Sequence, residues 1–315
     1  MANNNFEQKF ELNTAKEFLD FFTPWGGGTE NMIGYVFRGH SNAEKYKLIP
    51  SVLREDTNEA SWSLIGGRPA FEQWNFESWQ IHLEKMLLSK FYRLSNHNGL
   101  AIPVSQKFKN LLSTEFDFEI MGSLNTDYWI DDDLLEVAAL AQHYGVPTRL
   151  LDWTYDPLVA IYFASKSAKN EGGKIEIWAI NKEYLSFLWP TENRVNVKFI
   201  TPHYASNPNL NAQKGVFSHW PVLDISMAER MAQSPDYGPN FELTDRTPLD
   251  ELIRKNIKPT DEINILKRIT VPCTEARKIF NMIQMMGYSS AKLFPGYDGI
   301  VKTMQDNRIN NNDIV

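Results

Sequence analysis

The sequence predicts an α+β fold, with a single domain of small mixed or antiparallel sheets flanked by helices. Segments with the 3.6-residue period of helices and short β-rich runs both occur, without the strict alternation of a βαβ chain. Of the 315 residues, 43% are hydrophobic and 13% are aromatic, which suffices for a substantial core and excludes disorder over the whole length. We find neither an internal repeat nor a long linker, so we expect one folded domain over residues 14–303.

Capping and periodicity signals mark the expected helices. Thr14 followed by Glu17 has the form of a capping box, and Asp156 followed by Pro157 supplies an N-cap and a first-turn proline. Three aspartates at 131–133 precede an apolar segment, where they complement the positive end of a helix dipole. Helices are therefore predicted to begin at residues 14, 134 and 156 and to cover residues 77–94 and 274–286.

Short apolar or alternating runs mark the expected strands. Such runs lie at residues 32–37, 174–180, 215–220 and 263–269. Residues 48–51 form a further extended piece, whereas the Ser-, Asn- and Gly-rich stretch 56–69 predicts a loop. Residues 99–118 favour no single structure. We expect residues 1–13 to form a flexible tail and residues 304–315 a frayed polar tail.

Charge, cysteine content and missing motifs exclude several classes of protein. The formal net charge of −7 argues against a global basic surface for nucleic acid and leaves open a local basic patch. Cys273 is the only cysteine, so an internal disulfide framework and a cysteine-based zinc cluster are excluded, and we expect a small structural residue there. The sequence has no Walker A, His-Glu-x-x-His or Gly-x-Ser-x-Gly motif. Because no signal peptide or membrane span is visible, we predict a cytoplasmic location without a membrane partner.

The first unusual cluster is Arg38-Gly39-His40, which follows the apolar run 32–37. A guanidinium at the rim of a sheet needs an anionic partner or a bidentate acceptor, and glycine lets a ligand or another backbone approach closely. The cluster therefore indicates either a binding site or a structural arginine paired with a carboxylate such as Glu84 or Asp152.

The second and densest cluster spans residues 142–154, between two apolar helical segments. Buried polar groups there must be paired with one another or used by a ligand. A structural polar network and a ligand pocket are equally compatible with these residue types, and Trp153 could supply a stacking face. The polar and aromatic candidates are Gln142, His143, Arg149, Asp152, Trp153 and Thr154. A third cluster, residues 211–217, places the Gln213 amide at the start of a strand, where, taken alone, a simple turn is the favoured explanation.

These clusters, in this order, resemble the FRG domain family, named for the Phe-Arg-Gly of its first motif. The longest matching motif is residues 141–154, Ala-Gln-His-Tyr-Gly-Val-Pro-Thr-Arg-Leu-Leu-Asp-Trp-Thr. Other matching segments are residues 35–42, residues 48–51 with Arg54, the helix around Glu84, Phe91 and Arg93, Pro157 with Ala160 and Phe163-Ala164, residues 212–217 and residues 293–299. The resemblance covers about residues 14–303, and the family brings no settled activity with it.

A weaker resemblance is to ADP-ribosyltransferases of the Arg-Ser-Glu type, whose motifs follow the same order along the chain. It implies an ADP-ribosyltransferase-like core in which Arg38 holds the phosphate or ribose of NAD and Thr154 braces the nicotinamide pocket. Gln213 would contact the ribose hydroxyl near the breaking bond. Those enzymes place a carboxylate at that position to stabilise developing positive charge, and this sequence has an uncharged amide. Asp152 is the obvious carboxylate to substitute, and His143 could carry a proton near neutral pH.

The leading hypothesis is therefore a pocket that binds NAD or a related nucleotide as substrate and cleaves it or transfers ADP-ribose. An effector role in bacterial or phage conflict, as a toxin or defence protein, would suit such a domain. The alternatives are a non-catalytic nucleotide- or nucleic-acid-binding module and a metal-dependent hydrolase or nuclease built on Asp152, His143 and Asp298. No spacing resembles a metal site, so no metal ligand is predicted. The predicted catalytic residues are Arg38, His143, Asp152, Thr154 and Gln213. The predicted ligand-binding residues are Arg38, Gly39, His40, Gln142, Arg149 and Trp153.

Overall fold

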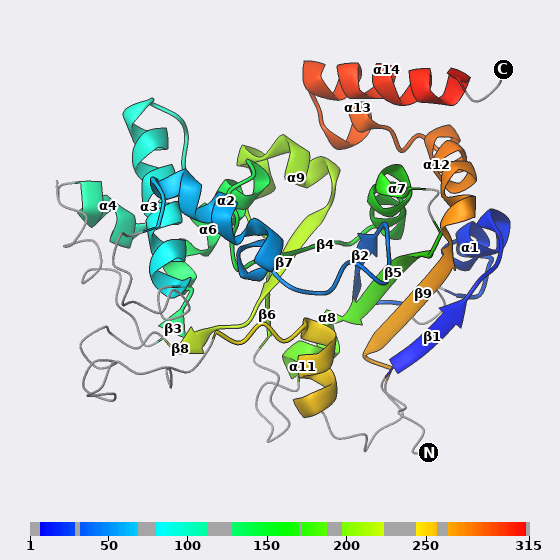
Figure 1. Ribbon diagram of the computed structural model, residues 1–315, viewed down its shortest axis with the longest axis horizontal. Helices are drawn as coiled ribbons and strands as arrows, with labels where there is room; N and C mark the ends of the chain where they lie inside the picture. The colour runs from blue at the N-terminus through cyan, green and yellow to red at the C-terminus, as the bar shows by residue number, and fades with distance from the viewer. Residues whose placement is uncertain are drawn as a thin grey trace.

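A seven-stranded mixed sheet organises the computed structural model (Figure 1). The structure describes residues 7–28, 32–68, 80–112, 128–169, 172–187, 197–223, 244–256 and 264–312. The strand order is β1 (Glu7–Glu11), β9 (Leu266–Pro272), β5 (Lys174–Asn181), β2 (Tyr35–His40), β4 (Leu151–Thr154), β7 (Gly215–His219) and β6 (Lys198–Ile200). Neighbouring strands are antiparallel except β1 and β9, which are parallel. A two-stranded sheet joins β3 (Tyr128–Trp129) to β8 (Val222–Leu223). The predicted α+β class is confirmed.

The sheet nearly separates between β2 and β4. Six residues of β2 pair with β5, from Tyr35 with Asn181 to His40 with Glu176. On its other side, β2 pairs with β4 at a single position, Phe37 with Thr154. Beyond that pair the two strands diverge, so Arg38, Gly39 and His40 border a gap in the sheet.

Helices cover both faces of the sheet. On one face, α1 (Ala15–Phe21), α7 (Pro157–Ser167) and α12 (Ala276–Met285) pack on β2, β5 and β9 through a buried apolar cluster that includes Phe37 and Ile177. On the other face, α8 (Lys182–Phe187) and α11 (Leu249–Asn256) cover a second cluster that includes Val36, Trp153 and Trp178. Because side chains alternate along a strand, neighbouring residues of β2 enter different cores.

Gly39 lets α7 approach β2 closely. A Cβ atom at this position would lie 2.1 Å from the backbone oxygen of Ala160. No other residue type fits there without moving the helix. The sequence left open whether a ligand or another backbone approaches this glycine. The backbone of α7 does so, and Gly39 also lines the pocket described below.

A third group of helices lies toward the left of Figure 1, with α9 nearest the middle, and packs through two further apolar clusters, one of which reaches β7. It contains α2 (Glu55–Ile65), α3 (Gln80–His97), α4 (Gln106–Leu112), α6 (Leu135–His143) and α9 (Pro208–Ala212). The chain ends with α13 (Ser290–Leu293) and α14 (Tyr297–Asn312), which lie at the top of Figure 1 above α7.

Several local expectations are confirmed. The Thr14 hydroxyl caps α1 by accepting from the Glu17 amide at 3.2 Å, and the Asp156 carboxylate caps α7 by accepting from the Leu158 amide at 3.0 Å. Cys273 is buried, and burial raises the pKa of its thiol, as expected of a structural cysteine. In the described part of the chain, no helix combines the length and apolar character that crossing a membrane requires.

Four local expectations differ from the structure. Within the predicted flexible tail 1–13, residues 7–11 form β1, which pairs with β9 over Glu7–Glu11. The predicted loop 56–69 is helical to Ile65, because Trp62 is buried in an apolar cluster and anchors the helix. The predicted frayed tail 304–315 continues α14 to Asn312, and Asp306 fixes this helix to Lys166 of α7 with an ion pair of 2.9 Å. Residues 48–51, expected to be extended, lead into a 3-10 turn (Ser51–Leu53) and join no sheet.

The buried His219 predicts a pH-dependent stability. Its side chain in β7 is fully buried, neither ring nitrogen has a hydrogen-bond partner among the described residues, and burial lowers its pKa to about 4. The unfolded chain takes up this proton near pH 6.5, so the stability present above pH 6.5 is lost as the pH falls toward 4. We expect His219→Phe to remove about 3 kcal/mol of this dependence in urea unfolding at successive pH values. Equal pH dependence in the wild type and His219→Phe, with exposed His203→Gln as control, contradicts this assignment.

Candidate functional site

A pocket of about 360 Å³ lies where β2 and β4 separate, on the face covered by α7. Helix α7 contributes one wall, and α6 and α9 contribute residues to the opposite one. Its polar lining consists of Arg38, Gln142, His143, Asp152, Thr154 and Gln213. Its apolar lining includes Phe37, Val159, Phe163, Leu210, Phe217 and Phe294. Residues from three distant sequence clusters therefore meet in one place.

Arg38 lies in the gap between the two strands. Its Nη1 donates to the backbone oxygen of Asp152 at 2.7 Å and lies 3.5 Å from the Asp152 carboxylate. The carbonyl of Asp152 in β4 has no backbone hydrogen-bond partner on β2, and the guanidinium supplies the missing donor. Burial lowers the pKa of Arg38, Asp152 opposes that shift, and the nearby Arg54 adds to it. The positive charge of Arg54 close to Arg38 favours binding of a further anion beside Arg38.

A second chain of hydrogen bonds fixes the Asp152 carboxylate. Gln142 Nε2 donates to Asp152 Oδ1 at 2.5 Å, and Gln142 Oε1 accepts from the Thr148 hydroxyl. Since the amide is held at both ends, its orientation is determined. The Asp152 side chain is 60% exposed, so its carboxylate remains open to a ligand.

His143 is half-buried at the end of α6. Its Nε2 lies 3.0 Å from the side-chain nitrogen of Asn209, which is a donor, so Nε2 accepts and the neutral ring carries its proton on Nδ1. Burial lowers the pKa of His143, while the Asp152 charge acts in the opposite direction. The imidazole is therefore neutral near pH 7, and its one acceptor nitrogen, Nε2, is occupied by the Asn209 donor.

Thr154 and Gln213 connect the pocket to the C-terminal part of the chain. The Thr154 hydroxyl donates to the backbone oxygen of Gln213 at 2.7 Å, and Gln213 Nε2 donates to the backbone oxygen of Leu293 at 3.0 Å. Phe294 follows directly and lines the pocket. The Gln213 amide thus ties the C-terminal segment to the start of β7, and its Oε1 remains as a possible acceptor.

Aromatic side chains form much of the apolar half of the pocket, and residue-by-residue reasoning from the sequence did not select them. Phe163 of α7 and Phe294 pack edge to face, with ring centroids 6.1 Å apart. Both phenylalanines belong to segments that resemble the FRG family, so a signal for them was present in the sequence. The arrangement suits a planar, weakly polar ring.

Arg149 is not placed in the pocket. It is buried, and Nε and Nη2 donate to the two oxygens of Glu84 at 2.9 and 2.7 Å. The indole nitrogen of Trp129 donates to the same carboxylate at 2.7 Å. The predicted ligand contact is therefore replaced by an internal ion pair, which joins α3 to the segment between α6 and β4.

Trp153 borders the pocket, but its side chain, like that of His40, is buried. The Trp153 indole is buried in the core on the opposite face of the sheet, where its nitrogen donates to the Ser218 hydroxyl at 2.8 Å. The expected stacking face is therefore occupied by the core. His40 is 4% exposed and lies behind Arg38, with Nε2 3.2 Å from Arg38 Nε.

The pocket residues that precede residue 172 lie in a segment that matches a known protein family. Residues 34–172 match the model of the FRG domain. This chain contains an FRG domain. The matched residues carry β2, α6, β4 and α7, whereas Gln213 and Phe294, which complete the pocket, lie beyond the match. No curated protein and no solved structure matches the chain.

Two further observations bear on alternatives. Among the described residues, no group of three His, Cys, Asp or Glu side chains is arranged to hold a metal ion.

A second concavity of about 480 Å³ lies along β6, where Lys198 pairs with Asp132 at 3.0 Å. It is larger than the pocket at Arg38 but contains none of the residues predicted from the sequence, so we place the functional site at the gap in the sheet.

The Arg149–Glu84 pair yields a prediction about stability. We expect Arg149→Met to lower the free energy of unfolding by about 3–5 kcal/mol, because it leaves a buried carboxylate without its cation. In the double variant Arg149→Met with Glu84→Gln, much of this loss is restored, since no uncompensated charge remains. Urea unfolding of the single and double variants measures both effects. A loss below about 1 kcal/mol in Arg149→Met contradicts a structural role for the pair.

Proposed function

We propose that the pocket of the FRG domain binds NAD or a related nucleotide as a substrate and cleaves the bond between nicotinamide and ribose. One observation carries the proposal. A guanidinium and an open carboxylate are fixed together at the gap in the sheet, in a pocket whose remaining wall is aromatic and aliphatic. A nucleotide offers the same combination of anionic groups, sugar and planar ring.

Arg38 is the group that would hold a phosphate. Guanidinium groups bind phosphate through several hydrogen bonds in one plane, and Arg38 Nη2 is not committed to another described residue. Arg54, whose Nε donates to the backbone oxygen of Ile49 at 2.9 Å, adds positive charge nearby. The wall that contains Phe163 and Phe294 would receive the planar ring.

The size of the pocket suits part of a dinucleotide. Small-molecule sites usually enclose roughly 300–1,000 Å³. At about 360 Å³, this pocket would hold a ring and a sugar, and the rest of the nucleotide would extend past Arg38. This fit supports a ligand larger than an inorganic anion.

Asp152 supplies the charge that the reaction requires. The bond from ribose to nicotinamide breaks, nicotinamide leaves with the bonding electrons, and water or an acceptor nucleophile bonds to the ribose carbon and loses a proton. A fixed carboxylate stabilises the positive charge that develops on the ribose. His143 lines the same pocket and would accept the proton at Nε2 after the Asn209 donor moves away.

A non-catalytic nucleotide-binding module is the second candidate. The observation in its favour is that Gln213, at the position where the transferases resembled have a carboxylate, is an amide bonded to the Leu293 backbone oxygen. In that case Arg38 binds the nucleotide and no bond is cleaved. An effector role in bacterial or phage conflict remains a hypothesis that depends on NAD cleavage.

Release of nicotinamide from NAD, followed by proton NMR, tests the proposal. We expect release by the wild type, a decrease of at least about 100-fold in Asp152→Asn with little change in NAD affinity, and a loss of about tenfold in affinity in Arg38→Gln. Asp132→Asn is the matched control, because Asp132 is also an exposed aspartate paired with a cation and lies outside the pocket.

The outcomes separate the candidates. NAD binding that depends on Arg38 without release of nicotinamide favours the binding module. Neither release nor binding contradicts the assignment of NAD to this pocket, provided that the unfolding temperatures of the variants match that of the wild type.

A further inference from the structure

We infer that His40 and Glu176 are positioning residues that orient the Arg38 guanidinium toward the pocket. The inference rests on the proposed function for its consequence, anion binding by Arg38, and on geometry within the protein for its mechanism. Neither side chain lines the pocket among the described residues, and both are almost fully buried.

The contact between Arg38 and His40 requires one protonation state. Arg38 Nε lies 3.2 Å from His40 Nε2 and always carries a hydrogen, so Nε2 must be the acceptor. His40 is then neutral, with its proton on Nδ1. Burial lowers the pKa of His40, which favours this neutral form against the opposing effect of Glu176.

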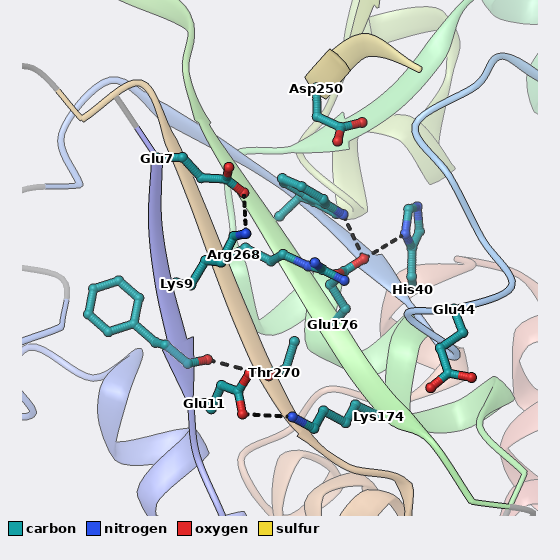
Figure 2. Close-up of polar contacts among 12 residues, drawn as sticks. Glu7, Lys9, Glu11, His40, Glu44, Lys174, Glu176, Asp250, Arg268 and Thr270 are labelled. Carbon is teal, nitrogen blue, oxygen red and sulfur yellow. Dashed lines mark hydrogen bonds and ion pairs between the residues drawn. The ribbon is translucent and has the colours of Figure 1, made fainter. Parts of the chain in front are cut away.

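Glu176 selects the tautomer. His40 Nδ1 lies 3.3 Å from Glu176 Oε2, and a carboxylate oxygen accepts the Nδ1 proton (Figure 2). The carboxylate is itself fixed, because the Trp178 indole nitrogen donates to Oε2 at 2.7 Å and Arg268 donates to Oε1. Glu176 and His40 are directly paired across β5 and β2, so the sheet holds both backbones.

This chain of contacts determines where the guanidinium points. Nε is bound to His40 and Nη1 to the backbone oxygen of Asp152, so the plane of the group is fixed at two positions. Nη2 is the donor left for a ligand. Fixing the group before the ligand arrives reduces the rotational entropy lost on binding.

Charged groups on several elements surround His40. They are Arg38 on its own strand, Glu176 on β5, Arg268 beyond it on β9, and Arg54 at the start of α2. The acidic side chains of Glu44 and Asp250 also lie in this region of Figure 2, and no contact joins either of them to His40. Protonation of His40 would remove the acceptor for Arg38 Nε and add a third cation beside Arg38 and Arg54.

Two substitutions of similar size separate positioning from packing. In His40→Gln, the amide oxygen reaches about as far as Nε2 and can accept from Arg38. In His40→Asn, the amide reaches only about as far as Nδ1, so it can hydrogen-bond to Glu176 but cannot accept from Arg38. We expect the dissociation constant for NAD at about pH 7.5 to rise about tenfold in His40→Asn and to stay within about threefold in His40→Gln.

A pH series adds a readout that packing alone would not move. Burial places the pKa of His40 below its ordinary value of 6.5, so the wild type should lose NAD affinity relative to His40→Gln as the pH falls through that lowered pKa, since the glutamine does not titrate. Titration of NAD itself and of His143 is common to both proteins and cancels in the ratio. A ratio that changes in favour of the wild type as the pH falls overturns the inference.

A measurement without ligand keeps this inference separate from the proposed function. Nitrogen-15 NMR of the Arg38 Nε–H group should show slow exchange with water in the wild type and His40→Gln, and exchange about tenfold faster in His40→Asn. Equal exchange in the two variants overturns the inference. If the wild type does not bind NAD while these exchange rates differ as expected, the proposed function fails and the positioning role stands.

Discussion

The gap between β2 and β4 is the constraint on which the site depends. With a single pair joining these strands, backbone groups of β4 lack strand partners, and the Arg38 guanidinium replaces part of the missing ladder by binding the Asp152 carbonyl. A buried guanidinium without such acceptors would be costly. The same gap therefore creates the pocket, places a cation in it and brings Asp152 beside that cation.

Two buried networks hold the borders of this gap. On one side, the Glu176 carboxylate accepts hydrogen bonds from Arg268, Trp178 and His40, and it thereby links β9, β5 and β2. On the other side, Arg149 and Glu84 join α3 to the segment that leads into β4. Each network satisfies its charges internally, which leaves Arg38 and Asp152 as the partly exposed pair available to a ligand.

Much of the pocket was predictable because its residues flank recognisable strands and helices. Arg38, Gln142, His143, Asp152, Thr154 and Gln213 were selected from the sequence and line one pocket. Arg149 was misassigned because an internal ion pair and a ligand contact use the same residue types, and Glu84 lies 65 residues away. The strand β1 was missed because its partner β9 is more than 250 residues distant, and residues 7–11 alone show no strong strand pattern. The family match establishes an FRG domain in residues 34–172, while the ADP-ribosyltransferase-like core remains a prediction.

A crystal structure of the protein with ADP-ribose tests most directly whether this gap is a nucleotide site. We expect a phosphate oxygen within hydrogen-bond distance of the Arg38 guanidinium and a sugar beside the Asp152 carboxylate, in the pocket lined by Phe163 and Phe294. Electron density for ADP-ribose in the concavity along β6, with an empty pocket at Arg38, would contradict the account.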